Sequence, residues 1–334
     1  MNDIHIVYAS DDGFAEMLGV SLVSLFENSQ DVENFHVYIL DSGISDLNRE
    51  RLRKVCESYH REEPHFIKAR DITEELGMDV NADRGSLSQY ARLFISRDLP
   101  ENLDRILYLD CDIIIVKSIA RLWNVDMHGK TVAALNDAFS ELYRTNIDLE
   151  PGDVMFNSGV MLIDLKRWKE QEIEKRLLNF IERKRGNIQQ GDQGALNAIL
   201  SHDIYCFDPV FNSVTIYYDF TYQEMLIYRK PAKGFYSEEE IRNATEDPVV
   251  IHFTTSFLSR RPWMKGCQHR YCGEWRKYKA LSPWKDEPLR SDNRPFWKQS
   301  GLRIFQLLPR RLAIHIAGFF QAYGRPMMNR IRTK

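Results

Sequence analysis

Short apolar runs alternate with segments of helical periodicity through the first part of the chain. The runs at 5–10, 35–43 and 65–70 are predicted to be strands, and the segments at 17–29 and 45–59 are predicted to be helices. Ser45 precedes the second helix as a candidate N-cap. Strands that alternate with helices predict βαβ units and a mostly parallel sheet, so the expected fold class is α/β.

The apolar run at 106–116, ILYLDCDIIIV, contains two carboxylates, Asp110 and Asp112. At alternate positions of an extended strand they point to the same side, and burying them requires a partner or a metal. If the strand ends there, both face a cleft and share Mg²⁺ or Mn²⁺, which binds the phosphates of a nucleotide. The alternative is a turn that carries solvated acids, because a D-x-D pair is common by chance.

Composition excludes several classes of protein. The 334 residues are 43% hydrophobic and 12% aromatic, which is enough for one large domain or two modest ones. The net charge of −3 gives no general attraction to nucleic acid. The sequence predicts neither a signal peptide nor a transmembrane helix. Five scattered cysteines predict a reduced, intracellular protein without a disulfide framework: Cys56, Cys111, Cys206, Cys267 and Cys272.

Charge is concentrated at the end of the chain. Residues 293–334 contain nine Lys or Arg and no Asp or Glu. After Pro309, a candidate first helical residue, an apolar stripe follows helical spacing: Leu312, Ile316, Phe319, Phe320 and Tyr323. A basic amphipathic helix predicts association with an anionic membrane surface, and docking on the rest of the protein is the alternative. We therefore expect a catalytic domain at 1–285 and a membrane-associating tail at 286–334.

Five motifs in a fixed order carry a family resemblance. They read ARLFISRDLP, ILYLDCDIIIVKSIARLW, FNSGVMLIDLKRW, GDQGALN, and IHF before a PW pair. Over roughly residues 3–275 the chain resembles glycosyltransferase family 8, which includes bacterial lipopolysaccharide α-galactosyl- and α-glucosyltransferases and the glycogenins. The resemblance implies a GT-A fold and retaining transfer of a hexose from UDP-galactose or UDP-glucose. The favoured acceptor is a glycan such as lipopolysaccharide core or another surface glycan, on the cytoplasmic, inner face of the cell membrane.

The resemblance also implies roles for single residues. Asp110, Asp112 and His252 match the metal ligands, and the imidazole favours Mn²⁺ over Mg²⁺. Asp192 and Gln193 match the catalytic pair, although Asp192 is also a candidate N-cap of the helix through 195–200. The remaining residues expected to bind the donor, besides the two metal-binding acids, are Ala9, Asp11, Arg92, Asp137 and Asn157. For Asp11 the alternative is a turn or N-cap, and for Asn157 a tight turn.

One segment departs from the family pattern. After the histidine, the family usually has a short glycine-containing link to a lysine, whereas this chain has HFTTSFLSRRPW. We expect Arg261 to contact the diphosphate, with Arg260 and Lys265 as the other candidates.

Two other functions compete with the transferase interpretation. Phosphatases of the haloacid dehalogenase type also carry D-x-D after an apolar strand, but they normally have Thr or Val where Ile114 stands. A degenerate transferase that only binds sugar or nucleotide is the second alternative.

Overall fold

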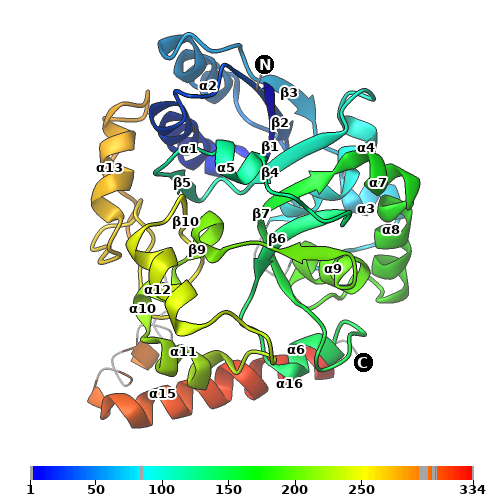
Figure 1. The fold of residues 1–334 in the computed structure, drawn as a ribbon, viewed down its shortest axis with the longest axis vertical. Coiled ribbons are helices and arrows are strands. Elements are labelled where there is room, and N and C mark those ends of the chain that lie inside the picture. Colours follow the sequence, from blue (N-terminus) through cyan, green and yellow to red (C-terminus); the bar gives the residue numbers. More distant parts are fainter. Residues whose placement is uncertain (1–2, 83–85, 293–299, 303–304, 306, 333–334) are drawn as a thin grey trace.

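The computed structural model describes residues 3–82, 86–292, 300–302, 305 and 307–332. A seven-stranded sheet lies at the centre, with the strand order β3-β2-β1-β4-β7-β6-β8 (Figure 1). Its strands are β1 (Asp3–Ser10), β2 (Asn34–Asp41), β3 (His65–Lys68), β4 (Arg105–Leu109), β6 (Val132–Asn136), β7 (Phe156–Asp164) and β8 (Ile204–Cys206). Only β7 runs antiparallel to its neighbours, β4 and β6, so the predicted mostly parallel α/β sheet is confirmed.

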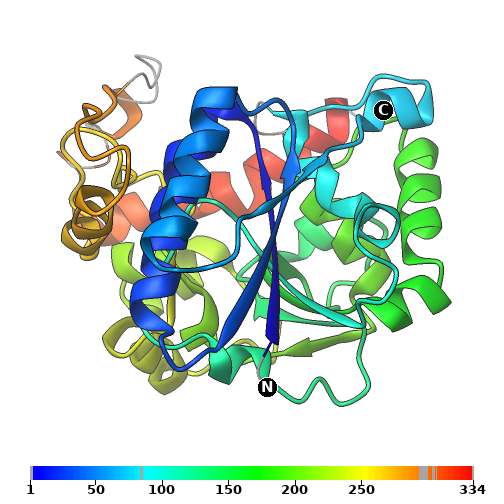
Figure 2. The same cartoon turned by 90° about the horizontal axis from the view of Figure 1, so that it is seen from above.

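The first helices begin close to where the sequence pattern places them. They are α1 (Ala15–Asn28) and α2 (Asp46–Ser58), and the Ser45 hydroxyl caps α2 by accepting a hydrogen bond from the Asn48 amide. The predicted strands at 5–10, 35–43 and 65–70 are β1, β2 and β3. In Figure 2 the helices of the first 60 residues, in blue, lie on one side of the sheet, whereas α8 (Ile173–Arg183), in green, lies on the other.

The remaining helices follow the strands in chain order. They are α3 (Ile72–Leu76), a 3-10 helix at Leu87–Phe94, α4 (Ile95–Asp98), α5 (Ala120–Trp123), α6 (Glu141–Thr145), α7 (Leu165–Glu170), α9 (Gly191–Leu200), α10 (Ile216–Asp219), α11 (Tyr222–Arg229), α12 (Glu238–Glu246) and α13 (Cys272–Ala280). A break separates α7 from α8, because Glu172 adopts a left-handed backbone conformation between them.

The apolar run at 106–116 is not one strand. β4 ends at Leu109, and β5 (Ile113–Ile115) belongs to a second sheet with β10 (Val250–His252) and β9 (Ser213–Val214). Asp110 and Asp112 occupy the bend between the two sheets. The bend allows two acids within an apolar run to leave the core, because neither continues a buried strand.

The C-terminal tail packs against the catalytic domain. Helix α15 (Arg310–Phe319) runs beside α11, and α16 (Arg325–Arg332) ends beside α6 (Figure 1). Pro309 is the N-cap of α15 rather than its first residue. Within the described residues, no helix is both long enough and apolar enough to cross a membrane. Four of the basic residues in the predicted tail lie outside the described residues: Arg294, Lys298, Arg303 and Lys334.

The docked face of the tail consists largely of small residues. Ala313, Ile314 and Gly318 are buried, whereas the predicted apolar stripe from Leu312 to Phe320 is largely exposed. A side chain at Gly318 would place its Cβ 2.7 Å from the Ile227 carbonyl oxygen, so glycine allows α15 to approach α11 closely. One face of α15 therefore docks on the rest of the protein, as the alternative prediction stated. The opposite face carries the exposed apolar stripe.

Hydrogen bonds continue the contact beyond α15. The Ser140 hydroxyl donates to the Ala322 carbonyl at 2.6 Å, and the Asn146 amide donates to the Pro326 carbonyl at 2.8 Å. At the start of α15, Arg310 forms an ion pair with Glu224 at 2.9 Å.

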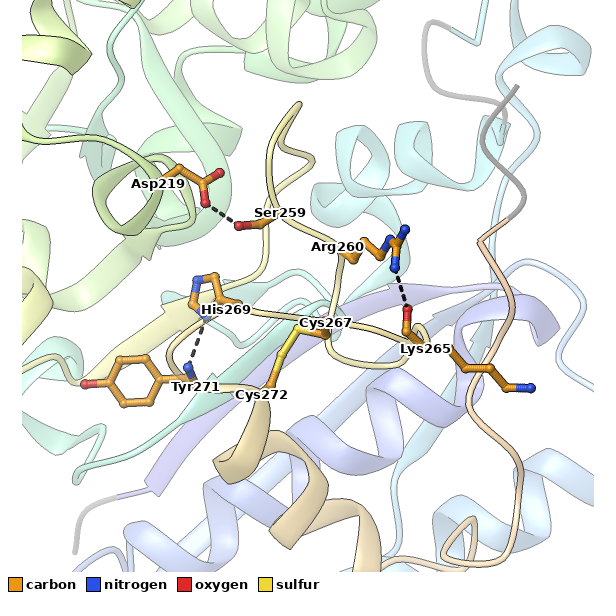
Figure 3. Close-up of a disulfide and its surroundings, with 8 residues drawn as sticks. All are labelled: Asp219, Ser259, Arg260, Lys265, Cys267, His269, Tyr271 and Cys272. Atoms are coloured by element: carbon orange, nitrogen blue, oxygen red, sulfur yellow. Dashed lines mark hydrogen bonds between the residues drawn. A yellow bond between two sulfur atoms is a disulfide. The ribbon is translucent and has the colours of Figure 1, made fainter. Parts of the chain in front are cut away.

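The segment 253–272 contains a cysteine pair that the sequence analysis treated wrongly. Cys267 and Cys272 form a disulfide, rather than remaining reduced, whereas Cys56, Cys111 and Cys206 are free thiols. Figure 3 shows the bridge at the base of this segment, near the start of α13, with Arg260 and Lys265 on the same loop. A scattered cysteine count does not detect a local pair, because the two thiols meet only when the loop between them turns back.

Candidate functional site

The candidate metal ligands converge at the bend between the two sheets. One ligand atom each from Asp110, Asp112 and His252 lies within 4.8 Å of the others, and we name these three residues the metal cluster. The Nε2 atom of His252 lies 3.1 Å from an Asp112 oxygen and 3.8 Å from an Asp110 oxygen. Strand pairing creates this proximity, because His252 is opposite Ile113 in the antiparallel pair of β10 and β5.

Gly159 on β7 leaves the space that the metal cluster uses. A Cβ atom built there would lie 2.2 Å from His252 Cε1 and 2.8 Å from an Asp110 carboxylate oxygen. Any other residue at this position would displace the ligands. Two carboxylates and an imidazole around an uncrowded point form a donor set that fits a divalent cation.

A hydrogen-bonded chain orients the histidine. Its Nδ1 atom lies 3.0 Å from Asn212 Oδ1, and the Asn212 amide donates to Asn157 Oδ1 at 3.0 Å. The Asn157 amide in turn donates to Asp137 at 3.3 Å. With the Nδ1 hydrogen directed to Asn212, the Nε2 lone pair faces the two aspartates, which is the tautomer that a metal requires. Asn157 and Asp137 therefore support the metal cluster from the side opposite the two carboxylates.

Arg92 connects the metal cluster to Asp192, a member of the predicted catalytic pair, Asp192 and Gln193. Its guanidinium donates to Asp110 at 2.8 Å and lies 3.0 Å from an Asp192 oxygen. It is buried, and although burial lowers the pKa of Arg92, the neighbouring Asp110 and Asp192 carboxylates more than offset this and raise the pKa. A permanent buried cation thus fixes two carboxylates in one arrangement.

The catalytic pair lies in the first turn of α9. The helix starts at Gly191 after Gln190, which has a left-handed φ of 69°, so Asp192 is inside the helix and is not its N-cap. Gln193 receives weak hydrogen bonds on Oε1 from the backbone and hydroxyl of Ser158, at 3.3 and 3.4 Å. Its Nε2 atom is buried and has no hydrogen-bond partner among the described residues.

The end of β1 lies beside the end of β4. Val7 pairs with Tyr108 in the parallel register, which places Ala9 next to Asp110 at the point where the strand order reverses. Such reversals are the usual ligand-binding crevices of open α/β sheets. Asp11 caps the short 3-10 helix that follows β1, and its other oxygen accepts a hydrogen bond from the Ser86 hydroxyl at 2.9 Å.

The three cations after His252 occupy different positions. Arg261 lies 3.2 Å from an Asp112 oxygen, whereas Arg260 forms an ion pair with Asp292 at 3.0 Å. Figure 3 shows the Lys265 side chain directed away from the disulfide. Burial alone would raise the pKa of Asp112, but His252 and Arg261 lower it, so the carboxylate is ionised. Of the three, Arg261 is the residue that reaches the metal cluster.

A cavity of about 1090 Å³ lies beside Gln193, and none of the three residues of the metal cluster lines it. Asp137, Asn157 and Gln193 line one part of it, and residues of α15 and α16 line another. Asp192 does not line this cavity and stays buried against Arg92.

Comparisons with known proteins agree with this geometry. The sequence profile described as glycosyl transferase family 8 matches residues 5–266. The chain belongs to glycosyltransferase family 8. Among family members of known sequence, it is 28% identical to general stress protein A of Bacillus subtilis over 84% of this chain and 94% of that protein. It is 23% identical to a lipopolysaccharide 1,2-glucosyltransferase of Escherichia coli, over 86% of this chain and 80% of that protein.

Solved structures confirm the fold expected for this family 8 glycosyltransferase. The galactosyltransferase LgtC, in complex with donor and acceptor sugar analogues, superposes with a TM-score of 0.70 over 89% of this chain and 99% of that one, at 24% identity. The expected GT-A type of fold is thus confirmed. Membership of the family implies a nucleotide-sugar donor and a glycan acceptor.

The structure brings most of the predicted residues together. Asp110, Asp112, His252, Arg92 and Arg261 form one connected group, and Asp192 joins it through Arg92. The sequence analysis missed Asn212 and Gly159. Gly159 was visible inside the FNSGV motif as a glycine within an apolar strand, which signals a close approach. Asn212 gave no such signal, because its role depends on a contact with a distant strand.

Proposed function

We propose that this protein is a retaining glycosyltransferase that transfers galactose or glucose from its UDP-sugar to a glycan acceptor. The acceptor proposed is lipopolysaccharide core or another surface glycan. The observation that carries the proposal is the metal cluster, with Gly159 leaving room beside it and Gln193 lining the adjoining cavity.

Asp110, Asp112 and His252 would hold the divalent cation, and we expect Mn²⁺ to be preferred over Mg²⁺ because one ligand is an imidazole. When bound, the ion neutralises negative charge on the leaving diphosphate. Arg261 would add a second positive charge beside the phosphates. Asp11 and Ala9, at the end of β1, would contact the uridine, and Arg92 would act mainly by fixing Asp110 and Asp192.

Retention is proposed to occur by front-face attack. The acceptor hydroxyl attacks the anomeric carbon from the side on which UDP leaves. The bond to the β-phosphate oxygen breaks, and that oxygen takes the acceptor proton. Gln193 is a poor nucleophile because its amide nitrogen lone pair is delocalised, so we assign its amide oxygen, Oε1, to stabilising the positive charge that develops on the sugar. Asp192 would hold donor hydroxyls while its charge is balanced by Arg92.

The alternatives receive less support. Membership of glycosyltransferase family 8 argues against the phosphatase interpretation. A degenerate binding protein would have lost part of the site, whereas the metal cluster and the catalytic pair are complete here.

We also propose that the tail associates with the inner, cytoplasmic face of the cell membrane. Leu312, Phe319 and Ile331 are each at least half exposed, and Arg311 and Arg330 lie on the same helices. Apolar side chains beside basic ones suit a surface of anionic lipid. Co-sedimentation with phosphatidylglycerol vesicles tests this: replacing Leu312 and Phe319 by glutamate should abolish binding, whereas Leu47→Glu, an equally exposed apolar site on α2, should not.

The decisive experiment for the transferase is release of UDP from a panel of UDP-sugars, with Mn²⁺ and with a chelator. We expect slow Mn²⁺-dependent release from one hexose donor, abolished in Asp112→Asn. Asp286→Asn, which changes an exposed acid, is the matched control and should behave as the unmodified protein. Absence of release and of binding with every UDP-sugar would refute the proposed function.

A further inference from the structure

The cavity beside Gln193 is larger than a single acceptor sugar requires, and the tail forms its far side. We propose that it takes an acceptor sugar carried on a lipid, with the sugar beside Asp137, Asn157 and Gln193 and the first part of the apolar chain against the tail. This inference rests on the proposed transferase function, and it assigns the C-terminal helices a direct part in acceptor recognition.

Continuity of the cavity is the first observation. A single space of about 1090 Å³ is lined both by the residues around Gln193 and by the tail. Ligands of drug size fill cavities of roughly 300–1,000 Å³, so the volume exceeds the needs of one hexose. A ligand that fills it must therefore contact both ends.

The chemistry of the far side is the second observation. Its apolar lining, which we name the tail wall, consists of Phe305, Leu308, Ile316, Ala317, Phe320 and Met328. Phe220 and Tyr228, from the domain beneath, face the same space. Aliphatic side chains such as Ile316 and Met328 offer no hydrogen bonds to sugar hydroxyls, and an unpaired hydroxyl is costly to bury. An alkyl chain suits this wall better than a second or third sugar.

The tail wall also carries polar neighbours at its edge. Gln321 and Arg325 line the cavity from the tail, and Arg229 lines it from α11. The Arg229 Nε atom has no hydrogen-bond partner among the described residues. Polar groups next to an apolar wall suit the junction between a sugar and a lipid.

The position of the opening is the third observation. Ile316, Phe320 and Met328 line the cavity and are themselves 42%, 61% and 56% exposed. The cavity thus opens through the tail wall onto the same exposed apolar face that includes Leu312 and Phe319. A lipid chain that extends out of the cavity would continue along this apolar face.

Soluble glycosides that differ only in the length of the aglycone test the inference. The donor is the UDP-sugar identified by the UDP-release experiment. The acceptors are matched methyl and n-octyl glycosides of glucose, galactose and lactose. Transfer is measured below the critical micelle concentration and without vesicles. We expect at least a tenfold lower KM for the octyl glycoside of the accepted sugar, since burying about two methylene groups is sufficient for that change.

Two neighbouring phenylalanines give a matched pair of variants. Phe320 lines the cavity and Phe319 does not, while their exposures of 61% and 59% are nearly equal. We expect Phe320→Ala to remove most of the octyl advantage and Phe319→Ala to retain it. Ala317→Trp, which fills the tail wall, should reduce the octyl glycoside to the level of the methyl glycoside.

A binding measurement covers the case in which none of these sugars is accepted. The apolar fluorophore N-phenylnaphthylamine should bind the unmodified protein and Phe319→Ala, and octyl glycoside, but not methyl glycoside, should displace it. Ala317→Trp should prevent this binding. Lack of displaceable binding in the unmodified protein, or displaceable binding that survives Ala317→Trp, overturns the inference.

The two proposals fail in different ways. Equal KM values for methyl and octyl glycosides, with Mn²⁺-dependent UDP release intact, overturn the lipid-linked acceptor and leave the transferase standing. Tighter binding of a free oligosaccharide than of the octyl glycoside would also overturn the lipid-linked acceptor and leave the transferase standing. Loss of all Mn²⁺-dependent UDP release in the unmodified protein removes both proposals.

Discussion

The two ends of the candidate site, the metal cluster and the tail wall, are held in place by different interactions. At the metal cluster, ligands on β10 and on the bend after β4 are fixed by hydrogen bonds, such as that between His252 and Asn212 at 3.0 Å. At the tail wall, position depends on the packing of α15 against α11 through Gly318 and on a few hydrogen bonds to the tail backbone. The metal end is thus rigid and polar, and the tail end is apolar and attached to a separate helix.

This difference indicates which properties can change independently. The metal cluster and Arg92 form one network, so a change in any member disturbs the others. The tail wall contains no member of that network, and the residues of the network do not line the cavity. Acceptor preference can therefore vary without loss of the donor chemistry, and substitutions at the two ends should produce distinct failures.

The largest expected effect is at Gly159. Replacing it by alanine would force a methyl group to 2.2 Å from His252 Cε1, so the ligands must separate. We expect Gly159→Ala to lower Mn²⁺-dependent UDP release by about a hundredfold. Gly273→Ala is the control, since a Cβ there meets nothing within 4 Å. Wild-type activity in Gly159→Ala would contradict the rigidity that we assign to the metal cluster.

Next in size is the loss of Asn212. Asn212→Ala leaves His252 Nδ1 without its partner and frees the imidazole to rotate. Mn²⁺ affinity, measured by titration with paramagnetic resonance of the free ion, should fall about 10–100-fold. The exposed Asn124→Ala serves as the control. An unchanged affinity would mean that strand pairing alone orients the histidine.

At the tail end, Gly318→Val tests docking. The new side chain would clash with the Ile227 carbonyl and should weaken attachment of α15 by about 1–3 kcal/mol. Limited proteolysis of the tail should accelerate while UDP release continues. His315→Val, on the exposed side of the same helix, controls for the cost of valine in a helix. Loss of UDP release in Gly318→Val, with the fold intact, would break the proposed independence of the two ends.

Acid should loosen the segment beside the metal cluster before it releases the tail. Burial lowers the pKa of His269 to about 4, so the unfolded chain binds this proton more readily and stability falls as pH drops from about 6.5 to 4. His269→Gln should reduce the loss of unfolding free energy between pH 7 and pH 5 by about 1–2 kcal/mol. Urea unfolding at both pH values measures this, with the exposed His202→Gln as control.

The tail responds at lower pH. The Arg310 hydrogen bond lowers the pKa of Glu224 below its usual 4.5, so this contribution to stability is present above pH 4.5 and is lost only as pH falls through the lowered value. If tail proteolysis accelerates at pH 6, the assignment of early acid sensitivity to His269 is wrong.

The smallest effect is expected from the ion pair itself. Arg310 and Glu224 are partly exposed, so Arg310→Gln should weaken tail docking by only about 0–1 kcal/mol, and less in high salt. The proteolysis assay used for Gly318→Val measures it. An effect as large as that of Gly318→Val would indicate that charge, rather than close packing, attaches the tail.

Much of the catalytic half could be predicted from the sequence. The alternation of strands and helices predicted the sheet. Two aspartates in an apolar run indicated the candidate metal site, because a buried carboxylate requires a partner or a metal. His252 required the family resemblance, since a lone histidine after a strand has no distinctive pattern. Asn212 could not be found, because its function is a contact across two sheets.

The tail shows the opposite balance. Helical spacing correctly predicted a helix with an apolar stripe at Leu312, Ile316 and Phe319. Periodicity did not reveal that the small residues Ala313 and Gly318 form the docked face, because a small side chain adds little to an apolar pattern. The cavity wall therefore became visible only in three dimensions.

The pairing of β5 with β10 has a consequence for biosynthesis. Two ligands of the metal cluster emerge early from the ribosome, and the third, His252, follows only after most of the chain has been made. Contacts between such distant segments form late, because a long loop must close first. A nascent chain would therefore acquire metal only once its fold is nearly finished, and Mn²⁺ uptake would report the end of folding rather than its beginning.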